Sequence, residues 1–386
     1  MRFFAAVLLA VSLVLPSLAA PSPLRSVERY GGQTSGKYIV KFKKGISRKD
    51  WIAKLNLHSK VVDWDVLNGF AGALDENTLN SLRLSEDVEY ISEDGIMHTM
   101  ATQTNAPWGL QRISQAAKLS STSTSALTYT YTYDDSAGRG VDIYIVDTGI
   151  NTAHTDFGGR ARWGASFDGL PTSDGNGHGT HCAGTAAGTR YGVAKAANLI
   201  AVKVLSDSGS GSTSGIVSGL NWVLSQARAS GRPSIVSMSL GGGVSTALDN
   251  AVTTLTNAGI HVVVAAGNDN ANAANTSPAR APSAVTVGAS TITDARASFS
   301  NYGSVVDVFA PGASIISTWI GSTTATNSIS GTSMATPHIA GLVAYLIGKD
   351  GNISPAVMET KIKNLSVKNV LTGIPSGTVN FLAQNK

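Results

Sequence analysis

The stretch VDIYIV at residues 141–146 runs directly into Asp147. Its continuous apolar character is typical of a strand that is covered on both faces of a sheet. Similar apolar runs recur along the chain, and stretches with helical spacing separate them. The further strands that we expect are 199–205, 234–240, 261–267 and 284–290, and the expected helices are 178–188, 212–229, 246–258 and 333–347. This alternation predicts an α/β fold with a doubly wound parallel sheet, in which ligands bind beyond the carboxyl ends of the strands.

The first hundred residues differ from the rest in charge. They contain 12 Lys and Arg and 11 Asp and Glu, against 17 and 14 in residues 101–386. This difference in charge density indicates a domain boundary near residue 100. Before it, the pattern predicts a small α+β domain of the split-βαβ type. Its expected strands are 37–42, 61–67, 69–74 and 88–92, and its expected helices are 47–57 and 75–84.

The N-terminus and the composition narrow the class of protein. Residues 1–20, MRFFAAVLLAVSLVLPSLAA, are typical of a cleaved secretory signal peptide. We find no second long apolar stretch and therefore expect a secreted, extracellular protein with no membrane partner. The single cysteine, Cys182, excludes a disulfide framework, and a net charge of +4 is too diffuse to indicate nucleic-acid binding. Residues 21–36 predict a linker, and the Ser- and Thr-rich residues 120–138 predict a surface loop.

Two motifs point to acid–base chemistry. Asp147 follows its strand, where a carboxylate can orient a histidine, although a turn or capping Asp would look the same. His178 lies in GNGHGTHCAG (175–184), whose glycines allow another segment to approach the imidazole. The expected helix places His181 and Cys182 close to His178, so a Zn²⁺ site is one interpretation, but no distant Cys completes a ligand set. The other interpretation is a general base held by Asp147.

Two further motifs could stabilise negative charge. Ser333 opens a helix in SISGTSMATPHIAG (328–341), where free N–H groups and the macrodipole favour an oxyanion. A plain N-cap serine is the alternative. Pro337 lies in the first turns of that helix, where its missing N–H costs least. Asn268 ends the motif AAGN and could donate its amide to the same oxyanion, or it could be a turn asparagine.

In this order, the motifs resemble those of the subtilases. DTG begins at Asp147, HGTHCAG at His178, AAGN ends at Asn268, and GTSMATPH surrounds Ser333. The resemblance is closest to the proteinase K branch of secreted fungal serine proteases. It implies a triad in which Ser333 attacks the scissile carbonyl, His178 transfers the proton and Asp147 fixes the imidazole tautomer. Asn268 and the Ser333 N–H would bind the oxyanion.

The same resemblance implies how the chain is organised and what it acts on. Residues 1–20 would be a signal peptide, 21–100 a linker with an inhibitory and chaperone propeptide, and 101–386 a subtilisin-like peptidase domain. We expect self-cleavage after Met100, and the propeptide to act as an intramolecular inhibitor. The implied activity is broad hydrolysis of peptide bonds in proteins by a monomeric enzyme, through an acyl-enzyme and with no cofactor for the chemistry.

Substrate binding is also inferred from the resemblance. Two extended segments would flank the substrate backbone, and a pocket would favour an apolar or aromatic side chain before the cut bond. The implied substrate-binding residues are Ser208, Gly209, Gly211, Ser239, Leu240, Gly241, Ala265, Ala266 and Gly267. Thr213 stands where close relatives often have a rim Tyr, which leaves the outer aromatic subsite open. Ser277-Pro278 matches a cis-proline position.

A structural Ca²⁺ is the cofactor that the resemblance implies. Pro282 and Ala284 would bind it through backbone carbonyls and Asp307 through its carboxylate, which suits a hard cation. A solvated Asp307 near a turn is the alternative. A second family site is not expected, because Val370 stands where an acidic residue would be needed. For Cys182 we expect a buried structural thiol rather than a catalytic one.

Three other functions compete with a secreted peptidase. An esterase-type hydrolase is opposed by the chain order and by GTSMA in place of G-x-S-x-G. A catalytically inactive binding or inhibitor protein is opposed by the complete triad. An intracellular processing protease is opposed by the signal sequence.

Overall fold

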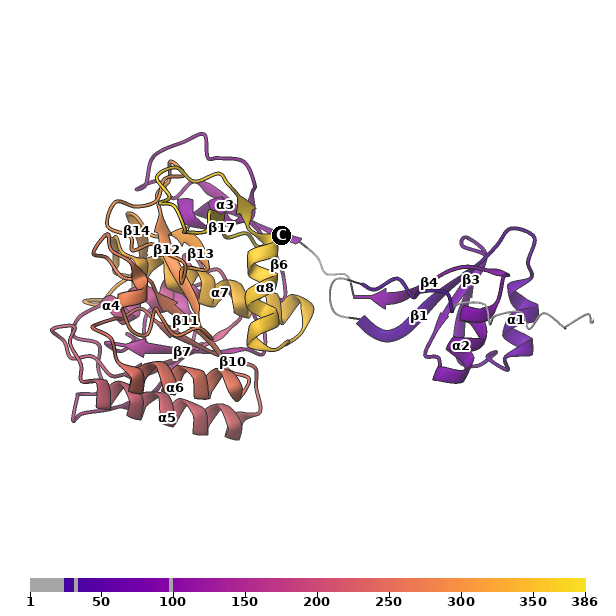
Figure 1. Ribbon diagram of the computed structural model, residues 1–386, viewed down its shortest axis with the longest axis horizontal. Coiled ribbons are helices and arrows are strands. Elements are labelled where there is room, and N and C mark those ends of the chain that lie inside the picture. The colour runs from indigo at the N-terminus through magenta and orange to yellow at the C-terminus, as the bar shows by residue number, and fades with distance from the viewer. Residues whose placement is uncertain (1–23, 31–33, 97–99) are drawn as a thin grey trace, which may run out of the picture. The chain divides into compact units, whose positions relative to one another are not determined.

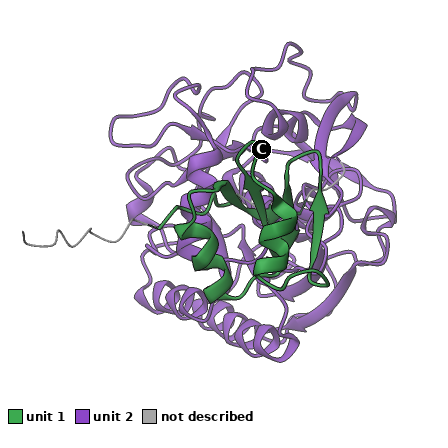
Figure 2. Cartoon of the chain, turned by 90° about the vertical axis from the view of Figure 1, so that its right-hand side faces the viewer, with its two compact units in different colours: residues 1–96 green, residues 97–386 purple. Residues whose placement is uncertain are grey.

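The computed structural model describes residues 24–30, 34–96 and 100–386. The expected signal peptide, residues 1–20, lies outside the described residues. The chain divides into two compact units, residues 1–96 and 97–386, which Figure 2 colours separately. Among the helices of the described residues, none has the length and apolar character needed to cross a bilayer.

The first unit is the α+β domain that the sequence predicted. Its four antiparallel strands lie in the order β2-β3-β1-β4, and two helices pack on them. The strands are β1 (Thr34–Phe42), β2 (Val61–Trp64), β3 (Gly69–Gly72) and β4 (Val88–Gly95), and the helices are α1 (Arg48–Lys54) and α2 (Glu76–Leu84). Ser47 and Asp75 cap the two helices through side-chain oxygens that accept backbone N–H groups. The expected linker at 21–36 is partly wrong, because Glu28 exchanges backbone hydrogen bonds with β4.

The second unit is built on a nine-stranded sheet in the order β16-β17-β13-β12-β11-β10-β7-β9-β8 (Figure 1). Its strand pairs are parallel except for β16 with β17, so the predicted doubly wound parallel sheet is confirmed. The strands are β7 (Asp142–Asp147), β8 (Ala161–Ser166), β9 (Asn198–Lys203), β10 (Ser234–Met238), β11 (His261–Ala265), β12 (Val285–Ser290), β13 (Val308–Pro311), β16 (Val367–Lys368) and β17 (Phe381–Leu382). The chain passes from one side of β7 to the other between β9 and β10. The carboxyl ends of β7 and β10 therefore meet at a topological switch point.

Helices cover both faces of this sheet. The α-helices are α3 (Trp108–Ser114), α4 (His178–Ala187), α5 (Thr213–Ser230), α6 (Thr246–Asn257), α7 (Thr332–Asp350) and α8 (Pro355–Leu365), with short 3₁₀ turns η1 (Thr155–Phe157) and η2 (Ala273–Asn275). Alternate residues of β7 enter different cores: Ile143 and Ile145 join α4 and α7, whereas Tyr144 and Val146 join α5 and α6. This alternation explains why the strand is apolar throughout.

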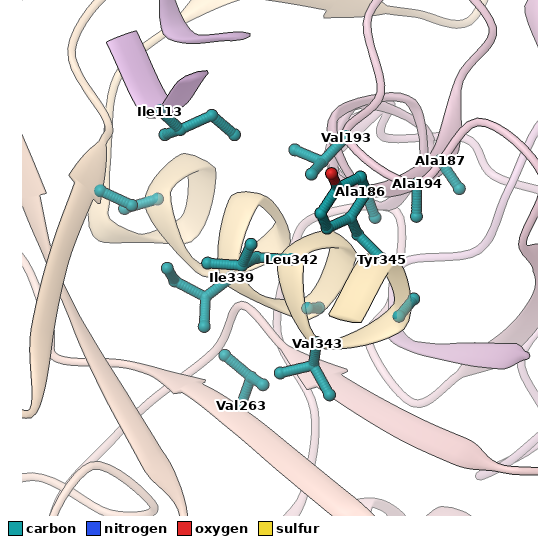
Figure 3. Close-up of a cluster of buried hydrophobic side chains, with 14 of the residues drawn as sticks. Ile113, Ala186, Ala187, Val193, Ala194, Val263, Ile339, Leu342, Val343 and Tyr345 are labelled. Atoms are coloured by element: carbon teal, nitrogen blue, oxygen red, sulfur yellow. The ribbon is translucent and has the colours of Figure 1, made fainter. Parts of the chain in front are cut away.

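The larger core surrounds α7. Ile339, Leu342, Val343 and Tyr345 project from it among side chains of the neighbouring elements (Figure 3). These neighbours include Ile113, Ala186, Ala187, Val193, Ala194 and Val263. The small alanines allow α4 to approach α7 closely, and this contact positions the two helix N-termini that bear His178 and Ser333.

Two antiparallel strand pairs complete the unit. They are β5 (Met100–Ala106) with β6 (Tyr129–Asp134), and β14 (Ile315–Thr318) with β15 (Thr326–Ile329). The expectation of a surface loop over 120–138 is wrong for its second half. There the alternating TYTYTY forms β6, and Tyr131 is fully buried.

Candidate active site

Asp147 and His178 meet at the carboxyl end of β7. The His178 Nδ1 donates to Asp147 Oδ1 at 2.8 Å, and the Thr148 N–H donates to the same oxygen at 2.7 Å. Asp147 is fully buried, whereas a quarter of the His178 side chain is exposed. Gly179 permits this approach, because a Cβ there would lie 2.2 Å from the Gly149 carbonyl oxygen. The carboxylate thus fixes the imidazole tautomer with Nε2 free for chemistry.

The surroundings of His178 favour its protonated form. Burial acts to lower the pKa of His178, but the charge and hydrogen bond of Asp147, together with the charge of Asp174, outweigh it and raise that pKa. Asp174 was not predicted from the sequence. Its carboxylate accepts hydrogen bonds from Thr148 Oγ1 at 2.9 Å, from Thr180 Oγ1 at 2.6 Å and from the Gly177 N–H at 2.9 Å. It therefore links the segment after Asp147 to the helix that begins at His178.

Contacts of its backbone carbonyl hold Ser333 near Asp147 and His178. Pro337 has no N–H to donate to the carbonyl four residues earlier, so the Ser333 carbonyl is free for other donors. It accepts from Ser239 Oγ at 2.8 Å and from Cys182 Sγ at 3.4 Å. The Sγ of Cys182, a carboxylate oxygen of Asp147 and a ring nitrogen of His178 all lie within 4.8 Å of one another. The structure therefore gathers the three expected catalytic residues around one buried thiol.

Ser333 and Asn268 open into the same cavity. The Ser333 hydroxyl donates to the Ser239 carbonyl at 3.2 Å, and the Ser333 N–H is among the first N–H groups of α7, which have no partner within the helix. Asn268 Oδ1 accepts from the Thr332 N–H at 2.8 Å and from Thr332 Oγ1 at 3.0 Å. With its oxygen occupied in this way, Asn268 has its NH₂ group available as a donor.

Two cavities adjoin this site, and the segment 239–242 lies between them. The smaller one, of about 280 Å³, is lined by Leu240, Ala265, Gly267, Asn268 and Ser333, among others. The larger one, of about 470 Å³, includes His178, Gly209, Gly211, Thr213 and Leu240 in its lining. Of the expected substrate-binding residues, Ser208 and Ala266 line neither cavity. Ala266 is fully buried, and its carbonyl accepts from Asn301 Nδ2 at 2.9 Å.

The alternative Zn²⁺ site does not form. His181 is fully buried, and its Nε2 donates to the Ile315 carbonyl at 2.8 Å. Burial lowers the pKa of His181 to about 3. Burial, with a smaller contribution from the charge of Asp147, raises the pKa of the Cys182 thiol well above its usual value. A thiol that resists ionisation and a histidine turned to the backbone make a poor zinc site, and Cys182 is the buried structural thiol that we expected.

Asp307, the carboxylate expected to bind Ca²⁺, has protein partners on both of its oxygens. Asp307 immediately precedes β13, and its Oδ1 forms an ion pair with Lys363 Nζ at 2.7 Å. Its Oδ2 accepts the Thr286 N–H at 2.8 Å. Both oxygens of the only carboxylate in the expected set of Pro282, Ala284 and Asp307 are therefore engaged. The bond between Ser277 and Pro278 is cis, as the resemblance implied.

Comparisons with known proteins agree with this geometry. Residues 138–380 match the family model described as the subtilase family, and residues 57–100 match that of the peptidase inhibitor I9. The chain is 49% identical to a cuticle-degrading protease of Metarhizium anisopliae over 98% of its length and 96% of that protein's. It is 49% identical to the alkaline serine protease ver112 of Corniculantispora psalliotae, with 97% and 98% covered.

A solved structure gives the same result. The crystal structure of a cold adapted subtilisin-like serine proteinase matches with a TM-score of 0.67 and 46% identity, over 73% of this chain and 99% of that one. The expected family, fold class and reaction type are therefore confirmed. The chain belongs to the subtilase family and is a subtilisin-like serine endopeptidase with an I9 inhibitor domain before its catalytic unit.

Proposed function

We propose that Asp147, His178 and Ser333 are the catalytic triad of this peptidase. The observation that carries the proposal is the 2.8 Å bond between Asp147 and His178 next to Ser333, whose carbonyl is held by Cys182 and Ser239. Attack requires the Ser333 hydroxyl to turn from the Ser239 carbonyl towards His178 Nε2, a rotation about one side-chain bond. Free enzymes commonly hold such hydrogen bonds in a looser arrangement than their complexes do.

The proposed reaction has two stages. Ser333 Oγ attacks the scissile carbonyl carbon while His178 Nε2 takes the hydroxyl proton, and His178 then returns that proton to the leaving amine. The resulting acyl-enzyme is hydrolysed by water in the same way, with His178 again the base. Asp147 stabilises the imidazolium that forms in both stages. Asn268 Nδ2 and the Ser333 N–H are the proposed donors to the oxyanion.

The proposed substrates are proteins cut with broad specificity after apolar or aromatic residues. Main-chain pairing with Ser239–Gly241 and Ser208–Gly211 is indifferent to side chains, which favours a broad range. Leu240, Ala265 and Gly267 give the smaller cavity an apolar wall, which favours an apolar side chain, and Asp269, which also lines this cavity, disfavours an acidic one. Profiling of cleaved peptides tests this proposal, and a requirement for acidic or basic residues at the bond would contradict it.

We further propose that the protein is secreted as a zymogen and cuts itself after Met100, releasing the domain within 21–100 that inhibits it. Met100 is the first residue of β5, and pairing of β5 with β6 continues from Ala101, opposite Tyr133. Cleavage there therefore leaves β5 paired with β6 from Ala101 onward. N-terminal sequencing of the protein recovered from culture medium tests both claims, with Ala101 as the expected first residue.

A single substitution tests the triad. We expect purified Ser333→Ala to remain folded by circular dichroism and to lose peptidase turnover, because no other group replaces the attacking oxygen. The protein should also remain uncut at Met100. Turnover at the wild-type rate in this variant would refute the assignment. The proposed chemistry needs no metal ion, because the side chains of the triad and the two oxyanion donors carry out every step.

A further inference from the structure

Lys363 is a cation that belongs to this chain and lies where the family resemblance places a metal. It comes from α8, far along the sequence from Asp307, and its Nζ approaches Asp307 Oδ1 at 2.7 Å. The same Nζ approaches Glu359 Oε1 at 2.5 Å, one helical turn earlier. The Asp307 side chain is 15% exposed and that of Lys363 is 30% exposed, so water screens this ion pair only in part.

A Ca²⁺ and this ammonium group compete for the same oxygen. Calcium binds carboxylate oxygens at about 2.3–2.6 Å, and it requires six to eight oxygen ligands. The ammonium at 2.7 Å from Asp307 Oδ1 takes nearly the same position. Asp307 Oδ2 accepts the Thr286 N–H of β12 at 2.8 Å, so a cation bound by both carboxylate oxygens would have to share this oxygen with the backbone. The residues present therefore do not fit the implied metal.

We propose that Lys363 substitutes for the structural calcium ion at this position. Its ammonium then holds α8 against Asp307, the residue that precedes β13. Glu359 belongs to the same cluster, because the Lys363 Nζ forms ion pairs with both Asp307 Oδ1 and Glu359 Oε1. The ammonium therefore holds these two carboxylates close to each other. Without the ammonium, the carboxylates of Asp307 and Glu359 would remain, and the family resemblance adds the carbonyls of Pro282 and Ala284 to this set. Such an oxygen-rich set is one that Ca²⁺ binds.

The test measures the melting temperature with calcium and with a chelator. It uses the full chain in the Ser333→Ala background, which prevents self-digestion, and it needs no activity, so it stands apart from the proposed function. The measured quantity is the calcium-dependent rise in melting temperature that Asp307→Asn removes. For the otherwise unchanged chain we expect no such rise.

Removal of the ammonium should create a calcium response. We expect Lys363→Ala and Lys363→Met, which retains the side-chain stem, to melt lower in chelator and to gain about 5 °C at saturating calcium. The matched control is Lys361→Ala, which removes another ammonium of α8, one that is paired with Asp350 of α7, and should gain no response. A calcium response before any Lys363 substitution that Asp307→Asn abolishes would overturn the proposal. So would two folded Lys363 variants that show no gain.

Discussion

Replacing Asn268 tests the proposed oxyanion site quantitatively. In Asn268→Ala, one of two proposed donors is lost while the other, the Ser333 N–H, remains. Loss of one such donor typically lowers kcat by about 10²–10³, or about 2.7–4 kcal/mol. We expect the full effect, because two bonds from Thr332 hold Asn268 Oδ1 at 2.8 and 3.0 Å and fix the amide before substrate binds. KM should change little, since the charge develops only in the transition state.

The structure also predicts a separate cost in stability. Asn268 Oδ1 caps the N-terminus of α7 by accepting the Thr332 N–H, and loss of such a cap costs about 1 kcal/mol. Asn268→Asp is the matched control, since it keeps an acceptor for Thr332 but has no amide donor. We expect Asn268→Asp to retain more stability than Asn268→Ala and yet to lose at least as much kcat.

The assay is steady-state hydrolysis of a peptide substrate, with thermal unfolding measured alongside. If kcat of correctly folded Asn268→Ala stayed within a few-fold of wild type, the Asn268 amide would not be an oxyanion donor. A loss expressed only in KM would equally refute the reasoning.

Three further predictions concern buried ionisable side chains. Asp174→Asn removes a charge that favours protonated His178, so the acid limb of kcat/KM should move to lower pH; an unchanged profile would show that Asp174 has no electrostatic effect there. Arg112→Met leaves Asp294 buried without its bidentate partner at 2.8 and 3.1 Å, and should cost about 3–5 kcal/mol in unfolding free energy, measured by denaturant titration; a loss under 1 kcal/mol would contradict this. Burial lowers the pKa of His338 from 6.5 to about 4, so the unfolded state binds more protons between these values and stability should fall as pH decreases across this range; the melting temperature of His338→Phe should fall less steeply over the same interval.

Much of this molecule could be predicted from its sequence. The strand ending at Asp147 is apolar because both faces are covered, and the motifs at His178, Asn268 and Ser333 stand at the element ends where the structure has them. A signal was available for one contact that we did not predict. Pro337 lies four residues after Ser333, so the Ser333 carbonyl had to find partners outside the helix.

Other contacts gave no local signal. Tyr131 belongs to an alternating stretch, but the abundance of Ser and Thr around it favoured a loop, and only its packing in the core decides otherwise. The ion pair between Lys363 and Asp307 joins α8 to the sheet, and nothing near either residue in the sequence indicates the other. Asp174 lies in a loop, and the contacts that bring its carboxylate to Thr148 and Thr180 depend on the path of that loop, which the local sequence does not indicate.

Covalent labelling of the active serine tests the central claim most directly. The mature protein is treated with a serine-reactive phosphonofluoridate or sulfonyl fluoride, and the modified peptide is found by mass spectrometry while residual peptidase activity is measured. We predict one label per molecule, on Ser333 alone, with activity lost in proportion to labelling. A label on another residue, or full activity in protein that is stoichiometrically labelled at Ser333, would contradict the assignment of Ser333 as the nucleophile.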